Sequence, residues 1–407
     1  MTALLDHQGP SASPRRPEPG DRVRESMTRL PRALALPLTL LTGRPHLGQR
    51  PVRFTATRHL VNAFWSIGCG LVASATALAT GGWWLFLLLP GWAMTLHGMR
   101  NLRMMVYHQC AHRNMWRRPR LDAALGTALA GLLVVQDFKR YSEEHVGDHH
   151  ALHHMTLRDP TVQAFLVSLE LAPGMSRGQM WRRVLAKIAS PRFHLRFLAA
   201  RVRSYLHAAT PLARLCWVAT TAVVAALATW LHLWTFVLTA WVLPLTFFYQ
   251  ISNTLRLCVK HTFPAPEQRV RKGREYFGSL TNAIFLGEPA PDAALPPGRR
   301  LLAWTRWWLR MLLVHFPARY LVLTGDTVCH DFHHRHPMSK DWADYIFARE
   351  ADRVSGAGGW PDYRHVWGLV PAIDAVFDSL RAADPTEYSL SRLADINHRE
   401  LFAAFDD

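Results

Sequence analysis

The sequence has few acidic residues, no paired cysteines and no recognisable nucleic-acid-binding motif, and each shortage excludes a class of protein. Aspartate and glutamate total 30 against 47 lysines and arginines, which gives a formal net charge of +17. The five cysteines are scattered and include no C-x-x-C pair, so a disulfide framework is not expected. No helix-turn-helix, zinc-finger or aromatic-basic module accompanies the basic charge, so nucleic acid is not expected as a partner.

Charge is also absent from four long apolar runs, which excludes an ordinary soluble domain. These runs are Leu60–Thr80, Trp83–Met99, Leu215–Leu231 and Leu233–Ile251. About 20 apolar residues in a helix cross a hydrocarbon core roughly 30 Å thick. Gly81 and Gly82 separate the first two runs, and His232 separates the last two. The sequence therefore predicts an all-α integral membrane protein with four transmembrane helices arranged as two hairpins.

Basic residues gather at the inner ends of both predicted hairpins. They are Arg44, Arg50, Arg53, Arg58, Arg100, Arg103, Arg201, Arg203, Arg214, Arg256 and Lys260, whereas the two outer turns contain no lysine or arginine. By the positive-inside rule, both termini and all large loops are expected in the cytoplasm. The prediction is a multi-pass protein of the cell inner (plasma) membrane, with the lipid bilayer as a partner because basic residues attract anionic head groups. No signal peptide is expected, since residues 1–20 contain no apolar core of the needed length.

These features divide the chain into five predicted sections. They are a basic, partly disordered leader at 1–53, the first hairpin at 54–99, a cytoplasmic section at 100–210, the second hairpin at 211–252 and a second cytoplasmic section at 253–407. The leader is expected to be disordered to about residue 30, where proline, serine and arginine dominate. The two cytoplasmic sections, including C-terminal helices, are expected to form a helical cap.

Three further apolar segments are expected to lie along the membrane surface without crossing it. Leu30–Gly43 is short and contains two prolines, and Leu121–Val135 is also short. Leu301–Leu323 is long enough to span, but it contains two arginines on one helical face and an internal proline. Its tryptophans are typical of a helix anchored at the interface.

Histidines form two short boxes at widely separated places in the chain. His108 and His112, in YHQCAH, lie four residues apart, so on a helix both rings project from one face. In CHDFHHRHP, His330, His333 and His334 lie at spacings of three and four, which is a second one-face cluster. Each spacing suits capture of one metal ion by two rings of a helix.

A third box lies between these two and can be read in two registers. The stretch EHVGDHHALHH contains H-x-x-x-H-H, formed by His145, His149 and His150. It also contains a competing H-x-x-H-H, in which His153 and His154 join His150. The spacing alone leaves both registers open.

A single histidine, His261, follows the last predicted span and is preceded by Asn253. With it, the candidate ligands number nine: His108, His112, His145, His149, His150, His261, His330, His333 and His334. This is about twice what one zinc ion needs, so two metal ions sharing a site are predicted. Imidazole binds iron, zinc, copper and nickel alike, so the residue type does not identify the metal. Four aspartates could accept the second ring N–H of a ligating histidine: Asp148, Asp159, Asp326 and Asp331.

Other interpretations of the histidines are available from the sequence. A lone H-x-x-x-H is usually an ordinary surface or core pair. The histidine-rich run 145–154 could be a metal-buffering loop of a transporter. All three boxes, however, fall on the predicted cytoplasmic side, and this convergence favours a single metal centre.

The three boxes, in this order, resemble those of the membrane fatty acid desaturase superfamily, the integral-membrane di-iron desaturases and hydroxylases. The resemblance covers roughly Leu60–Pro337, and Asp159-Pro160, nine residues after His150, is also similar to the family. It implies that the eight box histidines are di-iron ligands, that His261 is an extra ligand and that Asn253 helps through a water molecule. The competing register at the second box leaves the ligand set open there, with His153, His154, Asp148, Asp159 and Asp331 as further candidates for ligation or support.

The resemblance further implies oxygen chemistry on an unactivated C–H bond, with O₂ as co-substrate. An acyl chain carried by a lipid, coenzyme A or a carrier protein would be desaturated. The alternative is a hydroxylase or oxygenase acting on an alkyl, carotenoid, sphingoid or specialised acyl substrate. No H-P-G-G haem segment is present, so an external electron donor similar to ferredoxin or rubredoxin is expected. A metal transporter or a b-type cytochrome is disfavoured, because the four runs contain essentially no ionisable residue at their centres.

Overall fold

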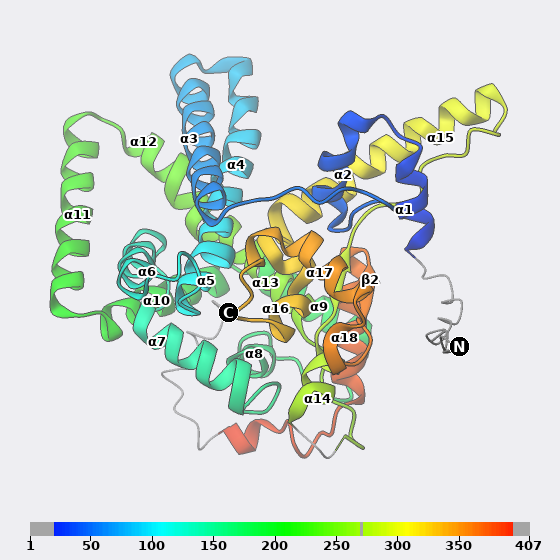
Figure 1. Ribbon diagram of the computed structural model, residues 1–407. Coiled ribbons are helices and arrows are strands. Elements are labelled where there is room, and N and C mark those ends of the chain that lie inside the picture. Colours follow the sequence, from blue (N-terminus) through cyan, green and yellow to red (C-terminus); the bar gives the residue numbers. More distant parts are fainter. Residues whose placement is uncertain (1–19, 269–271, 394–407) are drawn as a thin grey trace, which may run out of the picture.

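The computed structural model describes residues 20–268 and 272–393, and this part of the chain is mostly helical (Figure 1). Its helices are α1 (Asp21–Thr28), α2 (Ala35–Thr42), α3 (Ala56–Thr80), α4 (Leu88–Asn101), α5 (His108–Ala111), α6 (Pro119–Leu133), α7 (Phe138–Glu143), α8 (Pro160–Gln163), α9 (Arg177–Ala189), α10 (Pro191–Ala208), α11 (Pro211–Trp230), α12 (Trp234–Phe236), α13 (Tyr249–Lys260), α14 (Gly273–Leu280), α15 (Pro297–Arg310), α16 (His330–Arg335), α17 (Tyr345–Val354) and α18 (Leu369–Ala382). The exception to the predicted all-helical fold is one parallel pair of short strands, β1 (Ala283–Phe285) and β2 (His365–Trp367).

Three helices of the described residues are long and apolar enough to cross a membrane: Ala56–Thr80, Pro211–Trp230 and Trp234–Lys260. They coincide with three of the four predicted runs. The fourth predicted run, Trp83–Met99, is divided between a 3₁₀ turn at Gly82–Leu87 and helix α4. It is not among the three helices, because the 3₁₀ turn takes its first residues out of the helix, and the helix that continues beyond Met99 includes Arg100 and Arg103. The arrangement of four spans as two hairpins therefore stays a prediction.

Helices α3 and α4 pack side by side through small residues (Figure 1). Thr55 caps the start of α3 by accepting a hydrogen bond from the Arg58 amide, and Gly81 ends the helix with a φ of 66°. A Cβ atom on Gly70 would collide with Thr95 Oγ1 and with the Gly91 carbonyl. Close approach of helix backbones through glycine is typical of packing inside membranes, where dispersion contacts take the place of the hydrophobic effect.

Most of helix α11 stands apart from the rest of the protein (Figure 1), while Trp217 in its first half donates to the Gly131 carbonyl of α6 at 3.1 Å. Thr210 caps its first turn and Pro211 occupies the first helical position, a combination that favours helix initiation. Its apolar side chains, such as Leu215 and Trp230, are mostly exposed. An isolated helix with an apolar exterior has no stable place in water, so these side chains are expected to face lipid.

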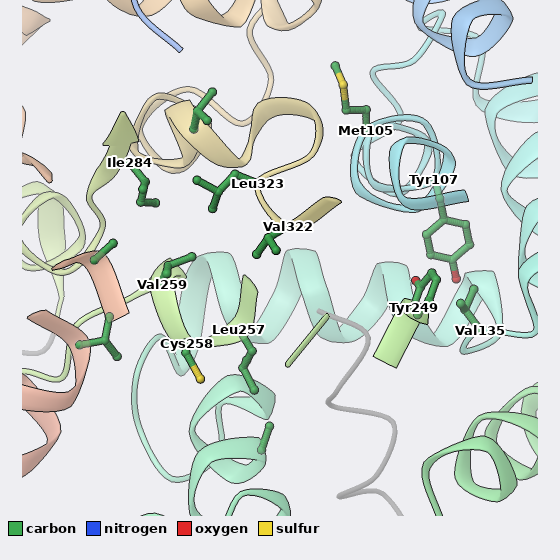
Figure 2. Close-up of a cluster of buried hydrophobic side chains, with 14 of the residues drawn as sticks. Met105, Tyr107, Val135, Tyr249, Leu257, Cys258, Val259, Ile284, Val322 and Leu323 are labelled. Carbon is green, nitrogen blue, oxygen red and sulfur yellow. The ribbon is translucent and has the colours of Figure 1, made fainter. Parts of the chain in front are cut away.

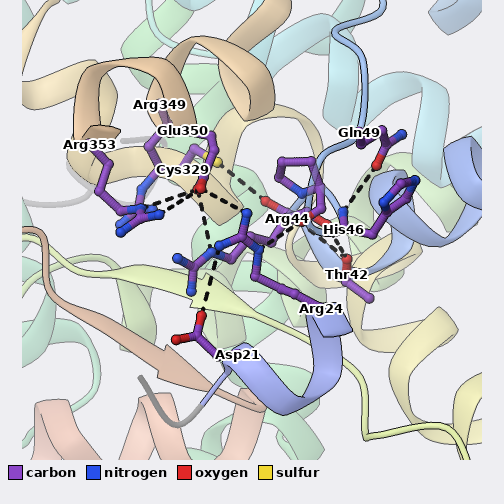
Figure 3. A network of polar contacts seen from close by, with 12 residues as sticks. Asp21, Arg24, Thr42, Arg44, His46, Gln49, Cys329, Arg349, Glu350 and Arg353 are labelled. Atoms are coloured by element: carbon purple, nitrogen blue, oxygen red, sulfur yellow. Dashed lines mark hydrogen bonds and ion pairs between the residues drawn. The ribbon is translucent and has the colours of Figure 1, made fainter. Parts of the chain in front are cut away.

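The segment predicted as a disordered leader is helical from Asp21 onward, while residues 1–19 lie outside the described part. Val23 and Met27 are buried against α15, and the Arg24 guanidinium donates to the Pro45 carbonyl and to Glu350 of α17 (Figure 3). The prediction of disorder was wrong for this helix, because a polar, proline-containing sequence does not reveal a distant acidic partner.

Two of the segments predicted to lie along the membrane surface, Leu121–Val135 and Leu301–Leu323, form helices that are interrupted. Helix α6 ends at Leu133, and the next residue, Val134, has a left-handed φ of 51°. The following helix, Phe138–Gly147, runs at 115° to α6. The segment Leu301–Leu323 belongs to α15 and to two π-helical turns, Met311–His315 and Ala318–Val322. Leucines of α15 are strongly exposed, and Leu301 and Leu302 are 71% and 70% accessible.

The core surrounds α13, of which nearly every residue is buried (Figure 2). Val322 and Leu323 lie close to Leu257 and Val259 of this helix. Helices α5, α9, α16 and α18 contribute further buried side chains to the same core. We call the helices around α13 the helical body, comprising α5 to α10, α13, α14 and α16 to α18.

The contact between α3 and α4 gives a first testable expectation. Gly70→Ala should destabilise the protein by roughly 1–3 kcal/mol, because the added methyl overpacks the interface. Gly68 lies in the same helix but has nothing within 4 Å of its Cβ position, so Gly68→Ala should be neutral or stabilising by up to about 1 kcal/mol. Thermal unfolding of both variants in detergent would measure this, and equal stability would contradict the close packing.

Candidate metal centre

The nine histidines selected from the sequence lie in two adjoining clusters of the helical body. The first cluster contains His108, His112, His145, His150 and His333. The second contains His149, His261, His330 and His334. Within each cluster the candidate ligand atoms all lie within 4.8 Å of one another, and every ring except that of His150, which is half-buried, is buried. Residues more than 200 positions apart in the chain thus meet at one place.

The first box follows directly on helix α4. Helix α4 continues through a π-helical segment, Leu102–Tyr107, into α5, which begins at His108. π-helical segments of this kind are rare and occur often at functional sites. His108 Nε2 lies 2.7 Å from His145 Nε2, so the first and second boxes touch.

The second box is a π-helix from Glu144 to Leu152. Its hydrogen bonds run from residue i to i+5, so residues five apart share one side of the helix. His145 and His150 are five apart and enter the first cluster, while His149 points into the second. The α-helical spacing used in the sequence analysis would instead have paired His145 with His149.

Helix α16 lies between the two clusters and supplies ligand candidates to both. His333 Nε2 lies 3.1 Å from His150 Nε2 in the first cluster. His330 Nε2 lies 3.2 Å from His334 Nε2 and 3.3 Å from His261 Nε2 in the second. His261 follows the last residue of α13, so the apolar segment Trp234–Lys260 also ends at the centre.

The neutral protonation state of these rings suits the binding of a cation. Burial lowers the pKa of eight of the nine histidines, namely His108, His112, His145, His150, His261, His330, His333 and His334. Neutral imidazole carries one N–H and one lone pair, and it is the form that binds a metal. The Nε2 atoms of His112 and His149 have no hydrogen-bond partner among the described residues. Converging lone pairs repel each other unless a positive ion lies between them, so the donor set fits two metal ions.

Asp159 determines which nitrogen of His149 is available. Both carboxylate oxygens lie 3.1 Å from His149 Nδ1, so Nδ1–H donates to Asp159 and Nε2 keeps its lone pair. Asp159 also accepts from the amides of Met155 and Thr161 at 2.6 and 2.8 Å and caps α8, which begins at Pro160. Burial by itself would raise the pKa of Asp159, but the interaction with His149 and these hydrogen bonds bring that pKa down to about 2.

The other three aspartates differ from one another. Asp326 Oδ2 lies 4.0 Å from His108 Nδ1, and burial raises the pKa of Asp326 to about 6. Asp331 instead accepts hydrogen bonds from the Arg349 guanidinium at 2.6 to 3.0 Å, so its carboxylate supports α16 through a buried ion pair. The side chain of Asp148 lies outside the described residues.

The remaining candidates lie near the centre in different ways. The ring of His154 is buried, with its centroid 4.8 Å from that of His261 and 5.0 Å from that of His334. It also forms a third group of candidate ligands with His149 and Asp159. His153 is half-buried and belongs to none of the three groups found in the described residues. Asn253 accepts a hydrogen bond from Arg100 at 2.7 Å.

Sequence reasoning missed the aromatic and basic side chains that hold the rings in place. Tyr141 stacks on His145 with ring centroids 5.0 Å apart, and the Arg103 guanidinium lies 4.1 Å from the Tyr141 centroid. Thr281 Oγ1 lies 3.2 Å from His261 Nδ1. Tyr141 precedes His145 by one helical turn, and that spacing was the one feature of the sequence that could have indicated their contact.

Apolar helices leading into a buried, histidine-rich centre define a membrane protein with a site that could hold metal. Residues 82–338, more than half of the chain, match the family model for fatty acid desaturases. The chain therefore belongs to the fatty acid desaturase family, which implies an oxidoreductase. No match was found among curated proteins or among solved structures.

The role of Asp159 can be tested through metal affinity. Asp159→Asn should weaken metal binding by roughly 10–100-fold, because the His149 tautomer is no longer fixed. Metal retained by the purified protein during competition with a chelator would measure the change. Asp378→Asn, on the exposed face of α18, is the matched control and should leave retention unchanged. Equal retention by both variants would contradict the assignment.

The buried rings also predict a pH dependence of stability in the metal-free protein. Burial lowers the pKa of His112 and of His154 to about 3, below the unfolded value of about 6.5. The unfolded chain then binds more protons, so stability is complete above pH 6.5 and falls as the pH drops toward 3. Each ring contributes a slope of about 1.4 kcal/mol per pH unit.

Chemical unfolding between pH 7 and pH 4.5 would measure these slopes. His154→Gln should reduce the slope by about 1.4 kcal/mol per pH unit, since one titrating ring is removed. His232→Gln, in an exposed turn, should not reduce it. A slope unaffected by His154→Gln would show that this ring is not held neutral.

Proposed function

We propose that the protein is an O₂-dependent membrane oxidase that holds two iron ions and introduces a C=C bond into a fatty acyl chain. The observation that carries the proposal is the division of nine histidines into adjoining clusters of five and four. Membership of the fatty acid desaturase family supports iron as the metal and an acyl chain as the substrate. Bound iron would supply the activation of O₂ toward an unactivated C–H bond.

The chain's own residues would hold the ions, exclude water and fix protons. The first ion would be held by His108, His112, His145, His150 and His333, and the second by His149, His261, His330 and His334. Asp159 keeps the His149 proton on Nδ1, as described above. Burial of the rings keeps bulk water from the centre, which protects a reactive oxidant from side reactions.

The proposed partners follow from charge and from the apolar helices. An external donor similar to ferredoxin or rubredoxin would be drawn to a protein of net charge +17, provided that the donor is acidic. The same attraction would apply to an acidic acyl carrier, while lipid or coenzyme A could also carry the chain. We further propose that the protein spans the inner membrane several times, with both termini and the centre in the cytoplasm. The arginines at the inner ends of the apolar runs support this orientation.

Mass spectrometry of acyl chains from a host expressing the protein tests the proposal. The wild type is expected to yield a species lacking two hydrogens, and His149→Ala should abolish it because one cluster loses a ligand. His207→Ala, an exposed residue of α10, is the control and should retain the product.

Other results would change the assignment. A histidine-dependent product that gains one oxygen would identify a hydroxylase of the same family instead. Wild-type protein that is purified without iron, and that gains none when iron is supplied, would contradict the di-iron centre.

A further inference from the structure

Three polar side chains of α13 are buried without a hydrogen-bond partner among the described residues: the Tyr249 hydroxyl, and Gln250 and Thr254, which share one face of the helix. Gln250 and Thr254 are both 0% exposed. Neither Gln250 Nε2, Gln250 Oε1 nor Thr254 Oγ1 has a hydrogen-bond partner among the described residues. The two residues lie four apart on one helix, so their side chains share a face.

Several neighbouring polar residues of the same segment are paired, whereas the adjacent Tyr249 hydroxyl has no partner in the described part of the chain. Thr246 Oγ1 donates to the Val242 carbonyl at 2.7 Å, and Ser252 Oγ donates to the Leu321 carbonyl. Asn253 accepts from Arg100, as noted above. Backbone carbonyls and an arginine thus satisfy polar side chains on other faces of the helix, but not on the face of Gln250 and Thr254.

A side-chain amide left unsatisfied in a protein interior costs free energy, and proteins keep such groups mainly for a purpose. Gln250 belongs to the apolar segment Trp234–Lys260, which is long enough to span a membrane. Polar residues inside such segments commonly mark the path of a substrate. The face that carries them continues through Leu257 to the end of α13, where His261 enters the second cluster.

We propose that Gln250 and Thr254 bind an uncharged hydroxyl group of the substrate. The inference rests on the proposed function and deepens it by naming a feature of the substrate. At 1.5 Å per residue, Thr254 and Gln250 lie about 10 and 16 Å along the helix from His261. The group would therefore lie roughly that far from the C–H bond that reacts.

The chemistry of the two side chains selects this class of ligand. An amide offers both a donor and an acceptor, and so does a hydroxyl group, so a hydroxyl of the substrate can satisfy both residues. A plain hydrocarbon chain would leave all three atoms unsatisfied. A carboxylate offers acceptors alone and would face the Gln250 carbonyl oxygen without a proton between them.

The first test uses the substrate-free protein in detergent. Gln250→Leu and Thr254→Val should each raise Tm by a few degrees, because an unsatisfied polar group is replaced by an apolar one of similar shape. Thr246→Val is the matched control and should lower Tm, since it removes a hydrogen bond that is made. A lower Tm for Gln250→Leu would show that the amide is satisfied within the free protein, and would overturn the proposal.

The second test compares two probes of equal chain length, n-octadecanol and n-octadecane, added at the same mole fraction to the detergent. The alcohol should raise the Tm of the wild type more than the alkane does, and the Gln250→Leu/Thr254→Val double variant should lose this difference. An equal effect of the two probes on the wild type, or a difference that persists in the double variant, would overturn the proposal. The readout needs no turnover, so it is separable from the product analysis that tests the proposed function.

Discussion

The repulsion among buried, neutral imidazoles is the constraint on which the rest of the structure depends. The Nε2 atoms of the nine rings converge within two small volumes, and a neutral ring has only one proton to share. Such a cluster is unfavourable unless cations occupy it, so the surroundings have to hold it together. Asp159 fixes one tautomer, Tyr141 stacks on His145, and the buried Arg349–Asp331 pair supports α16 between the clusters.

The centre is connected to the apolar part of the protein by two continuous helical segments. One runs from α4 through the π-helical segment Leu102–Tyr107 to His108, and the other runs through α13 to His261. Because a helix has a fixed rise, these connections set the distance from the apolar helices to the candidate metal ligands. A substrate drawn from lipid would follow the same direction, and the face of Gln250 and Thr254 lies along it.

Several elements could be predicted because their signal is local. Uncharged runs gave α3, α11 and the segment Trp234–Lys260, since burial in lipid excludes charge wherever the run lies in the fold. Others depend on partners that are distant in sequence. Helix α1 is held by an arginine that reaches Glu350, and β1 pairs with β2, which places Ala283 opposite the distant His365. The 3₁₀ turn before α4 likewise interrupts a run that composition alone presents as continuous.

For the centre, the sequence by itself determined the set of candidate ligands: nine histidines in three boxes and one single position, with an aspartate followed by proline. Only the tertiary structure decided how the nine rings are divided. His149 and His150 are adjacent in the chain yet enter different clusters, because the second box winds as a π-helix. The spacing of two residues shows whether their side chains point the same way only when the type of helix is known. Here the histidines of the π-helix contact side chains from α5 and α16 and the Asp159 that caps α8. The tertiary structure also places His154 beside the second cluster, leaves His153 outside both clusters, and pairs Asp331 with Arg349.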